Sequence, residues 1–336
     1  MNNIRKKLLK KFIGESYYYV AITKKSIIVV CLIIFFILLT SAGTFAYSQG
    51  KLQPFLSKTA IWLYEKPLIG TYIQAKWLPT DYILSQVLPM KGYQTKITLG
   101  DIVQKMVAAG IIDPQKLNET YKARGGTPRE MKELLSKPSH TPILVTKETS
   151  SWLINILWPL GLSNKMVINE KSPIAGKDVG NFASTGGWTL GKEENGGAYF
   201  NSVELIQLSQ NQEQRVKALA DSIYRPCCNN SSFFQDCNHG SAALALIELG
   251  VAQGLRDDEI YKTLLVFNSF WFPQNYTETA LYFQYAKNTV WDDIDPKLLL
   301  SKEYSSASGW IASVDIPAQK IPNLLPALQS GGGCSV

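Results

Sequence analysis

Several features that would assign a function directly are missing from this sequence of 336 residues. No segment of about 20–50 residues repeats along the chain, which argues against a solenoid or a propeller. The segment STGGWTLG, residues 184–191, lacks the Gly-Lys-Ser/Thr ending of a phosphate-binding loop. Asp292, Asp293 and Asp295 lack the spacing of a calcium-binding hand. The sequence therefore predicts neither a nucleotide site nor a calcium site from these motifs.

Charged residues are few in this chain, and most of the net charge lies at the N-terminus. Only 18% of the residues are charged and 46% are hydrophobic, which is a balance typical of a globular protein. The net charge is +7, but residues 1–25 hold seven lysines and arginines against one glutamate, so the rest of the chain is close to neutral. We therefore expect no nucleic-acid partner, and we interpret the basic tail as an orientation signal for a membrane segment.

The longest uncharged stretch follows that tail and comprises residues 26–47, SIIVVCLIIFFILLTSAGTFAY. A helix of this length spans about 33 Å, enough to cross a hydrocarbon core of about 30 Å. The main alternative is a cleaved signal peptide, because Thr44-Phe45-Ala46 resembles a cleavage site, although the run is longer than a usual signal core. We predict an uncleaved single-pass anchor in the cell membrane, with the N-terminus in the cytoplasm and residues 48–336 extracytoplasmic.

Beyond the anchor, helix signals predominate. Thr98 is predicted to cap one helix, and Asp113 precedes another helix that has Pro114 at its first position. Thr127 followed by Glu130 forms the pattern of a capping box. These signals predict a run of short helices after residue 97.

Further signals of the same kind follow along the chain. Residues 142–146 favour a short strand, and the apolar helix after them is expected to end or kink near Pro159. Ser209 followed by Gln212 forms a second capping box.

Together these signals predict a mainly α protein with a single N-terminal transmembrane helix and a mostly helical ectodomain that contains a Gly-rich irregular segment. We expect seven consecutive regions: a basic cytoplasmic tail (1–25), the transmembrane anchor (26–47), a juxtamembrane region (48–97), a helical region (98–165), a Gly/Asn-rich loop or short strands (166–208), a Cys/His helical-hairpin region (209–316) and a Pro/Gly-rich tail ending in a cysteine (317–336).

Three of the five cysteines and one of the two histidines lie within residues 225–240, RPCCNNSSFFQDCNHG. This stretch separates two predicted helices, and Asn238 is predicted to cap the second, 239–254, which forms a hairpin with 257–271. Cys237 then lies at a helix N-terminus, where the helix dipole favours a thiolate over a thiol. Outside the membrane, thiols tend to be oxidised, metal-bound or kept reduced for redox work.

The sequence leaves four roles open for this cluster. Cys227, Cys228, Cys237 and His239 supply a ligand set suited to zinc or copper(I), with Asp236 placed to orient His239. The cysteines can instead act in thiol–disulfide exchange, with Cys237 as the attacking thiol, or form structural disulfides that pin the loop. A hydrolytic Cys–His pair is disfavoured because Cys237 and His239 are too close in sequence. Metal binding is our leading interpretation.

The last cysteine, Cys334, follows Gly331-Gly332-Gly333 near the C-terminus. Three glycines make a flexible arm, so this thiol can reach many positions. We predict that Cys334 joins the cluster as a further sulfur ligand or as a resolving thiol; the alternative is a free thiol at a frayed end. Cys31, within the anchor, is interpreted as a small apolar residue.

The segment 224–265 resembles two groups of extracytoplasmic proteins. The pattern PCC…DCNHG followed by SAALALIELGVAQGLRDDEIYKTLL is similar to the PCYCGC-type cysteine-rich lipoproteins and to the CcmH/NrfF-type thiol proteins of cytochrome c maturation. It also resembles membrane-anchored proteins of uncultured bacteria. This chain lacks the lipobox of the first group and the C-x-x-C of the second. The resemblance therefore implies an extracytoplasmic thiol or metal role without a defined reductase activity.

Overall fold

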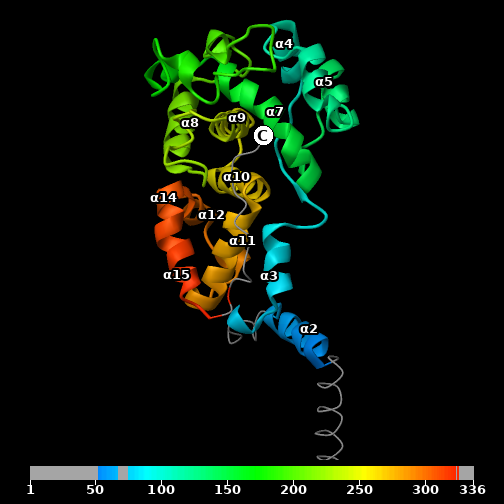
Figure 1. The fold of residues 1–336 in the computed structure, drawn as a ribbon, viewed down its shortest axis with the longest axis vertical. Helices are drawn as coiled ribbons and strands as arrows, with labels where there is room; N and C mark the ends of the chain where they lie inside the picture. The colour runs from blue at the N-terminus through cyan, green and yellow to red at the C-terminus, as the bar shows by residue number, and fades with distance from the viewer. Residues whose placement is uncertain (1–51, 67–74, 323, 325–336) are drawn as a thin grey trace, which may run out of the picture. The chain divides into compact units, whose positions relative to one another are not determined.

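A computed structural model describes residues 52–66, 75–322 and 324 of this chain (Figure 1). The described part is mainly helical, which confirms the predicted class. Within these residues, no helix is both long and apolar enough to span a bilayer. The predicted anchor at 26–47 and Cys334 lie outside the described residues.

Two compact units divide the chain, residues 1–73 and residues 74–336. The described helix of the first unit is α2 (Leu52–Tyr64). The α-helices described in the second unit are α3 (Thr80–Val87), α4 (Ile102–Ala108), α5 (Pro114–Lys122), α6 (Arg129–Ser136), α7 (Lys147–Ser163), α8 (Gln210–Ser222), α9 (Asn238–Ala252), α10 (Asp257–Trp271), α11 (Pro273–Tyr282), α12 (Pro296–Leu299), α13 (Lys302–Ser305), α14 (Ala307–Trp310) and α15 (Ile316–Gln319).

Short elements connect these helices. Strands β1 (Tyr93–Gln94) and β2 (Leu144–Val145) pair in antiparallel fashion, with Tyr93 opposite Val145. Single turns of 3₁₀ or π geometry are η2 (Ala75–Trp77), η3 (Val167–Lys171), η4 (Val179–Asn181), η5 (Gly196–Tyr199), η6 (Phe283–Lys287), η7 (Trp291–Asp293) and η8 (Ile311–Asp315). The strand expected at 142–146 is therefore present, but it covers only two residues.

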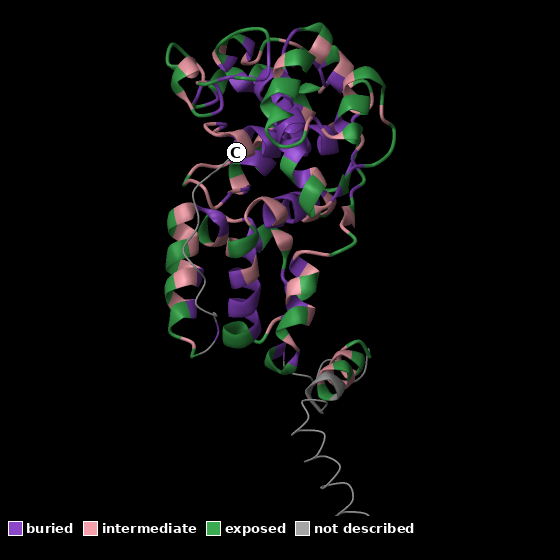
Figure 2. Ribbon diagram, turned by 45° about the vertical axis from the view of Figure 1, so that its right-hand side comes forward, coloured by how far each residue is buried: buried purple, intermediate pink, exposed green. Residues whose placement is uncertain are grey.

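Helix α9 forms the centre of the second unit. Every residue from 240 to 251 is buried, and Figure 2 shows the buried residues gathered in the helices at the middle of this unit. A helix that is apolar on all sides is stable only when other elements surround it. Helix α7 approaches it so closely that a Cβ on Gly161 would collide with the carbonyl oxygen of Ser241. This crossing fixes the N-terminal end of α9, where the cysteine-rich stretch ends.

The Gly/Asn-rich segment 166–208 is irregular, as predicted, and its regular elements are the 3₁₀ turns η3, η4 and η5. Trp188 is buried and packs edge to face against Trp158, with ring centroids 4.9 Å apart. The indole Nε1 of Trp158 donates to the carbonyl of Ser184 at 2.8 Å. The STGGWTLG motif is therefore a packed turn that covers α7.

Two of the predicted caps are present. Asp113 precedes α5 and accepts hydrogen bonds from the backbone N–H groups of Gln115 and Lys116. Ser209 and Gln212 form the expected reciprocal capping box at the start of α8. In both cases the cap and its partners lie within three residues of each other, so the local sequence is sufficient to specify them.

Two other predicted caps are wrong. Helix α6 starts after Pro128, and the hydroxyl of Thr127 donates to Asn118 Oδ1 at 3.0 Å instead of capping it. Helix α4 starts after Asp101, whereas the Thr98 backbone N–H donates to Gln253 Oε1 at 3.0 Å. Both threonines lie close in space to polar residues that are distant in the sequence, and these partners compete with the local cap.

Helix α7 also differs from the prediction at Pro159, because it continues through this residue to Ser163. Pro159 removes one backbone N–H from the helix. The helix is nevertheless retained because residues 152–163 are all buried, so that packing of this turn compensates for the lost hydrogen bond.

Candidate thiol centre

The cysteine-rich stretch forms an ordered loop between α8 and α9, and neighbouring elements hold it from two sides. The backbone N–H of Ala307, at the start of α14, donates to the carbonyl of Cys228 at 2.9 Å. From the Gly/Asn-rich segment, Ser184 Oγ donates to the carbonyl of Gln235 at 2.6 Å. These contacts bring together segments that are far apart in the sequence and fix the path of the loop.

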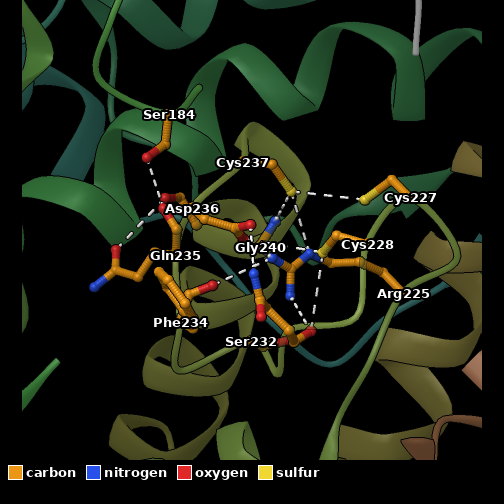
Figure 3. A network of polar contacts seen from close by, with 12 residues as sticks. Ser184, Arg225, Cys227, Cys228, Ser232, Phe234, Gln235, Asp236, Cys237 and Gly240 are labelled. Atoms are coloured by element: carbon orange, nitrogen blue, oxygen red, sulfur yellow. Dashed lines mark hydrogen bonds and ion pairs between the residues drawn. The ribbon is translucent and has the colours of Figure 1, made fainter. Parts of the chain in front are cut away.

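The side chain of Arg225 occupies the centre of this loop and is fully buried (Figure 3). Its Nη1 donates to the carbonyl of Asn230 at 2.9 Å, and its Nη2 donates to the carbonyl of Phe234 at 3.2 Å. Nη2 also pairs with Asp236 Oδ1 at 2.5 Å, and Nε donates to the sulfur of Cys237 at 3.2 Å. A buried guanidinium is stable only when its charge and its donors are matched in this way.

Arg225 is the functional residue that the sequence reasoning missed. One signal for Arg225 was present in the sequence, because this arginine directly precedes the Pro-Cys-Cys of the cluster. A second signal is Gly240, because a Cβ at that position would lie 2.6 Å from Arg225 Cζ. A glycine in the first turn of α9 therefore leaves the space that the guanidinium fills, but this relation is visible only in three dimensions.

The three cysteines of the loop converge beside this arginine. The sulfurs of Cys227, Cys228 and Cys237 all lie within 4.8 Å of one another. Cys227 Sγ and Cys237 Sγ are 3.6 Å apart. All three are free thiols and are partly exposed. The structure therefore confirms that the three predicted cysteines form one cluster.

Cys237, and not Asn238, is the residue that caps α9. Its sulfur accepts a hydrogen bond from the backbone N–H of Gly240 at 3.4 Å, and its backbone is extended with φ −132° and ψ 164°. Asn238 is the first helical residue, and its Oδ1 is buried without a hydrogen-bond partner among the described residues. The correction has a physical reason: the sulfur of Cys237 is an acceptor that Arg225 already orients toward the helix end.

Because of this geometry, the three thiols differ in pKa. Hydrogen bonds from Cys227 and Cys228, and then the charge of Arg225, hold the pKa of Cys237 well below its usual value of 9.0 in spite of burial. The pKa of Cys227 is raised by its hydrogen bonds to Cys228 and Cys237 and by burial.

For Cys228, the hydrogen bond with Cys227 lowers the pKa. Its hydrogen bond to Cys237 and its burial outweigh that effect and raise the pKa to about 11. The cluster therefore favours the thiolate form of Cys237 and the thiol form of Cys227 and Cys228.

His239 is placed differently from the predicted ligand set. The group of mutually close ligand atoms found among the described residues contains the three sulfurs alone. The imidazole ring of His239 packs against Phe272 and Trp271, with ring centroids 4.6 Å and 5.5 Å away. A hydrogen bond from His239 contributes to the low pKa of Cys237. His239 thus borders the cluster without joining the three sulfurs.

Asp236 also has a different role from the one predicted. Its Oδ1 pairs with Arg225, and its Oδ2 accepts a hydrogen bond from Asn230 Nδ2 at 2.7 Å. One carboxylate oxygen is therefore occupied by the guanidinium and the other by Asn230, and Asp236 does not serve to orient His239.

Comparison with protein-family models, with curated proteins and with solved structures gives no match for this chain. Three sulfurs at these separations are close enough to hold one metal ion. Two of them, at 3.6 Å, are also close enough to be joined by oxidation with a small side-chain movement.

Proposed function

We propose that this chain is a membrane-anchored extracytoplasmic protein that binds a soft metal ion, copper(I) or zinc, through Cys227, Cys228 and Cys237. The observation that carries the proposal is the convergence of the three sulfurs within 4.8 Å. Thiolates are the ligands that copper(I) and zinc select. The uncharged stretch at 26–47 behind a basic tail supports the anchor and the outward orientation.

The spacing of the sulfurs supports the same proposal. A tetrahedral zinc site with Zn–S bonds of about 2.3 Å has neighbouring sulfurs about 3.8 Å apart. Cys227 and Cys237 are separated by 3.6 Å, so small side-chain rotations are sufficient to complete such a set. Arg225 offsets part of the negative charge that three thiolates create. Copper(I) can be bound by three ligands. Zinc needs a fourth, and His239 or Cys334 is the candidate fourth donor.

The test is an anaerobic titration of the reduced full-length chain with copper(I) and, separately, with zinc(II). We expect one tightly bound ion per chain, with loss of binding in Cys227→Ser, Cys228→Ser and Cys237→Ser. Cys31→Ser is the matched control, because it makes the same substitution outside the cluster and should leave binding unchanged. Equal metal content in the wild type and in the triple serine variant would show that the cluster is not a metal site.

The role of the C-terminal arm is tested separately. Truncation after Ser330 removes Cys334 and should weaken zinc binding more than copper(I) binding if this thiol supplies a fourth ligand. Unchanged affinity for both ions excludes the arm from the site and leaves His239 or solvent at the fourth position.

A second candidate function is thiol–disulfide exchange, and the contact between Cys227 and Cys237 favours it. The Cys237 thiolate attacks one sulfur of an external disulfide, forms a mixed disulfide and releases the first external thiolate. The Cys227 thiol then loses its proton and attacks Cys237, which closes the internal disulfide and releases the second external thiolate. In this scheme Cys228 is not consumed.

This alternative is tested by equilibrating the metal-free chain with oxidised and reduced glutathione, then trapping and mapping the disulfides. A single Cys227–Cys237 disulfide, and faster alkylation of Cys237 than of Cys228 at pH 7, support exchange. Disulfides that form irreversibly during expression, with no bound metal and no exchange, support the remaining alternative of structural staples.

A further inference from the structure

Helix α2 is apolar, yet none of its side chains described at positions 56–64 is buried. Leu56 and Trp62 are 50% and 55% exposed, and Lys58 is the one charged residue of the helix. A helix of 13 residues is only marginally stable in water by itself. Because exposed apolar side chains favour removal from water, we expect α2 to lie against an apolar surface.

The exposed apolar residues of α2 lie on one side of the helix. At 3.6 residues per turn, Leu56, Leu63 and Trp62 fall within a sector of about 120°, which we call the apolar sector. Ser57 lies on the opposite side. The apolar sector therefore gives α2 one face suited to an apolar surface and one suited to water.

Lysines accompany Trp62 on both sides along the chain. Lys58 lies one helical turn before Trp62. Lys66 follows the helix, and its Nζ is 4.8 Å from the centroid of the Trp62 ring. Tryptophan is enriched where a membrane meets water, and a lysine stem can lie along an apolar surface while its ammonium group reaches the polar layer.

The position of α2 in the chain limits its distance from the predicted anchor. The anchor ends at Tyr47 and α2 begins at Leu52, so even a fully extended chain separates them by at most about 18 Å. The helix itself is about 20 Å long, which is too short to cross a hydrocarbon core of about 30 Å. The surface of the bilayer is therefore an apolar environment that α2 can reach without spanning it.

We propose that α2 lies along the outer surface of the membrane, with the apolar sector buried at the boundary between the headgroups and the acyl chains. This inference rests on the membrane anchor of the proposed function. Helices of this kind combine aromatic and leucine side chains on one face with lysines that extend to the lipid phosphates. Ser57 faces water in this arrangement.

Fluorescence quenching by brominated lipids tests the inference in the full-length chain, reconstituted into phosphatidylcholine vesicles. One set of vesicles carries bromine on the acyl chain near the headgroup, and the other carries it near the terminal methyl group. The chain has eight tryptophans, so the difference between the wild type and Trp62→Phe isolates the signal of Trp62. We expect Trp62 to be quenched, and more strongly by the bromine near the headgroup.

Two variants that add the same charge test which side of α2 contacts lipid. Leu56→Asp places a carboxylate in the apolar sector and should reduce the quenching of Trp62. Ser57→Asp places it on the opposite side and should leave the quenching unchanged. Trp62→Phe retains an apolar ring and keeps the test decisive if Leu56→Asp disturbs the chain.

Extraction of the same vesicles with alkaline carbonate distinguishes failure of this inference from failure of the proposed function. A chain that carbonate removes has no membrane anchor, which overturns both. A chain that is retained while lipid bromine does not quench Trp62 overturns this inference alone. Stronger quenching by the bromine near the methyl group also overturns it, because α2 then enters the hydrocarbon core.

Discussion

The thiol centre and the middle of α9 each bury one ionisable side chain completely, but the two side chains differ in how many hydrogen-bond partners surround them. Arg225 is fully buried and donates hydrogen bonds to Asn230, Phe234, Asp236 and Cys237. Glu248 is equally buried but accepts one hydrogen bond, from an amide nitrogen. Its Oε1 has no partner among the described residues.

The two pKa shifts follow from this difference. Burial lowers the pKa of Arg225, but the neighbouring thiols more than offset it, so the pKa is raised and the guanidinium stays charged. Burial raises the pKa of Glu248 well above 4.5, and the hydrogen bond from Asn164 is too weak to reverse that shift. Burial thus favours the charged form of a group where anions and acceptors surround it, and the neutral form where they do not.

The largest expected effect comes from removing the paired charge. Arg225→Met leaves the Asp236 carboxylate and two carbonyl oxygens without their donor, so we expect a loss of about 3–5 kcal/mol in the free energy of unfolding. Urea denaturation at neutral pH measures it. Arg129→Met, which removes an exposed arginine, is the control and should have no measurable effect. A similarly small effect at Arg225 would contradict the claim that this residue organises the loop.

A smaller effect is expected from filling the space beside the guanidinium. Gly240→Ala places a Cβ against Arg225, so we expect a loss of about 1–3 kcal/mol from overpacking. A double-mutant cycle with Arg225→Lys, which vacates part of the space, tests whether the Cβ and the guanidinium compete for it. The cost of Gly240→Ala should fall in that background, and strictly additive costs would show that the two residues do not compete for space.

The last expected effect concerns the buried acid Glu248, and its size depends on pH. Because the pKa of Glu248 is raised on folding, the folded chain holds this proton more tightly than the unfolded chain. The stability associated with it is fully present below about pH 4.5 and is lost as pH rises through the folded pKa, by up to about 1.4 kcal/mol per pH unit.

Glu248→Gln should abolish this loss, so the variant should match the wild type at acidic pH and exceed it at neutral pH. Urea denaturation across the pH range provides the measurement, with Glu119→Gln, at an exposed position on α5, as the matched control. A constant difference between Glu248→Gln and wild type at every pH would mean that Glu248 is not the titrating group.

Local sequence was sufficient for part of this fold. The caps at Asp113 and Ser209 were predictable because each depends on residues within one helical turn. The predictions at Thr98 and Thr127 failed where a distant side chain, Gln253 in the first case, supplied a competing partner.

The candidate site was likewise predictable only in part. The concentration of Cys227, Cys228 and Cys237 in one loop at a helix start is a property of the sequence, and the structure brings these sulfurs together. The assignment of the cap to Asn238 and of Asp236 to His239 failed because a buried arginine takes both Cys237 and Asp236 as partners.

The sequence by itself determined a mainly helical chain with its thiols gathered before one central helix, since helix periodicity, caps and the order of cysteines are local properties. Only the tertiary structure decided which residues those thiols meet and which buried charge persists. The loop that carries the partners of Arg225 is held at the carbonyls of Cys228 and Gln235 by Ala307 and Ser184, from segments far along the chain. Because desolvation and pairing depend on such distant neighbours, no local pattern could distinguish Arg225 from Glu248.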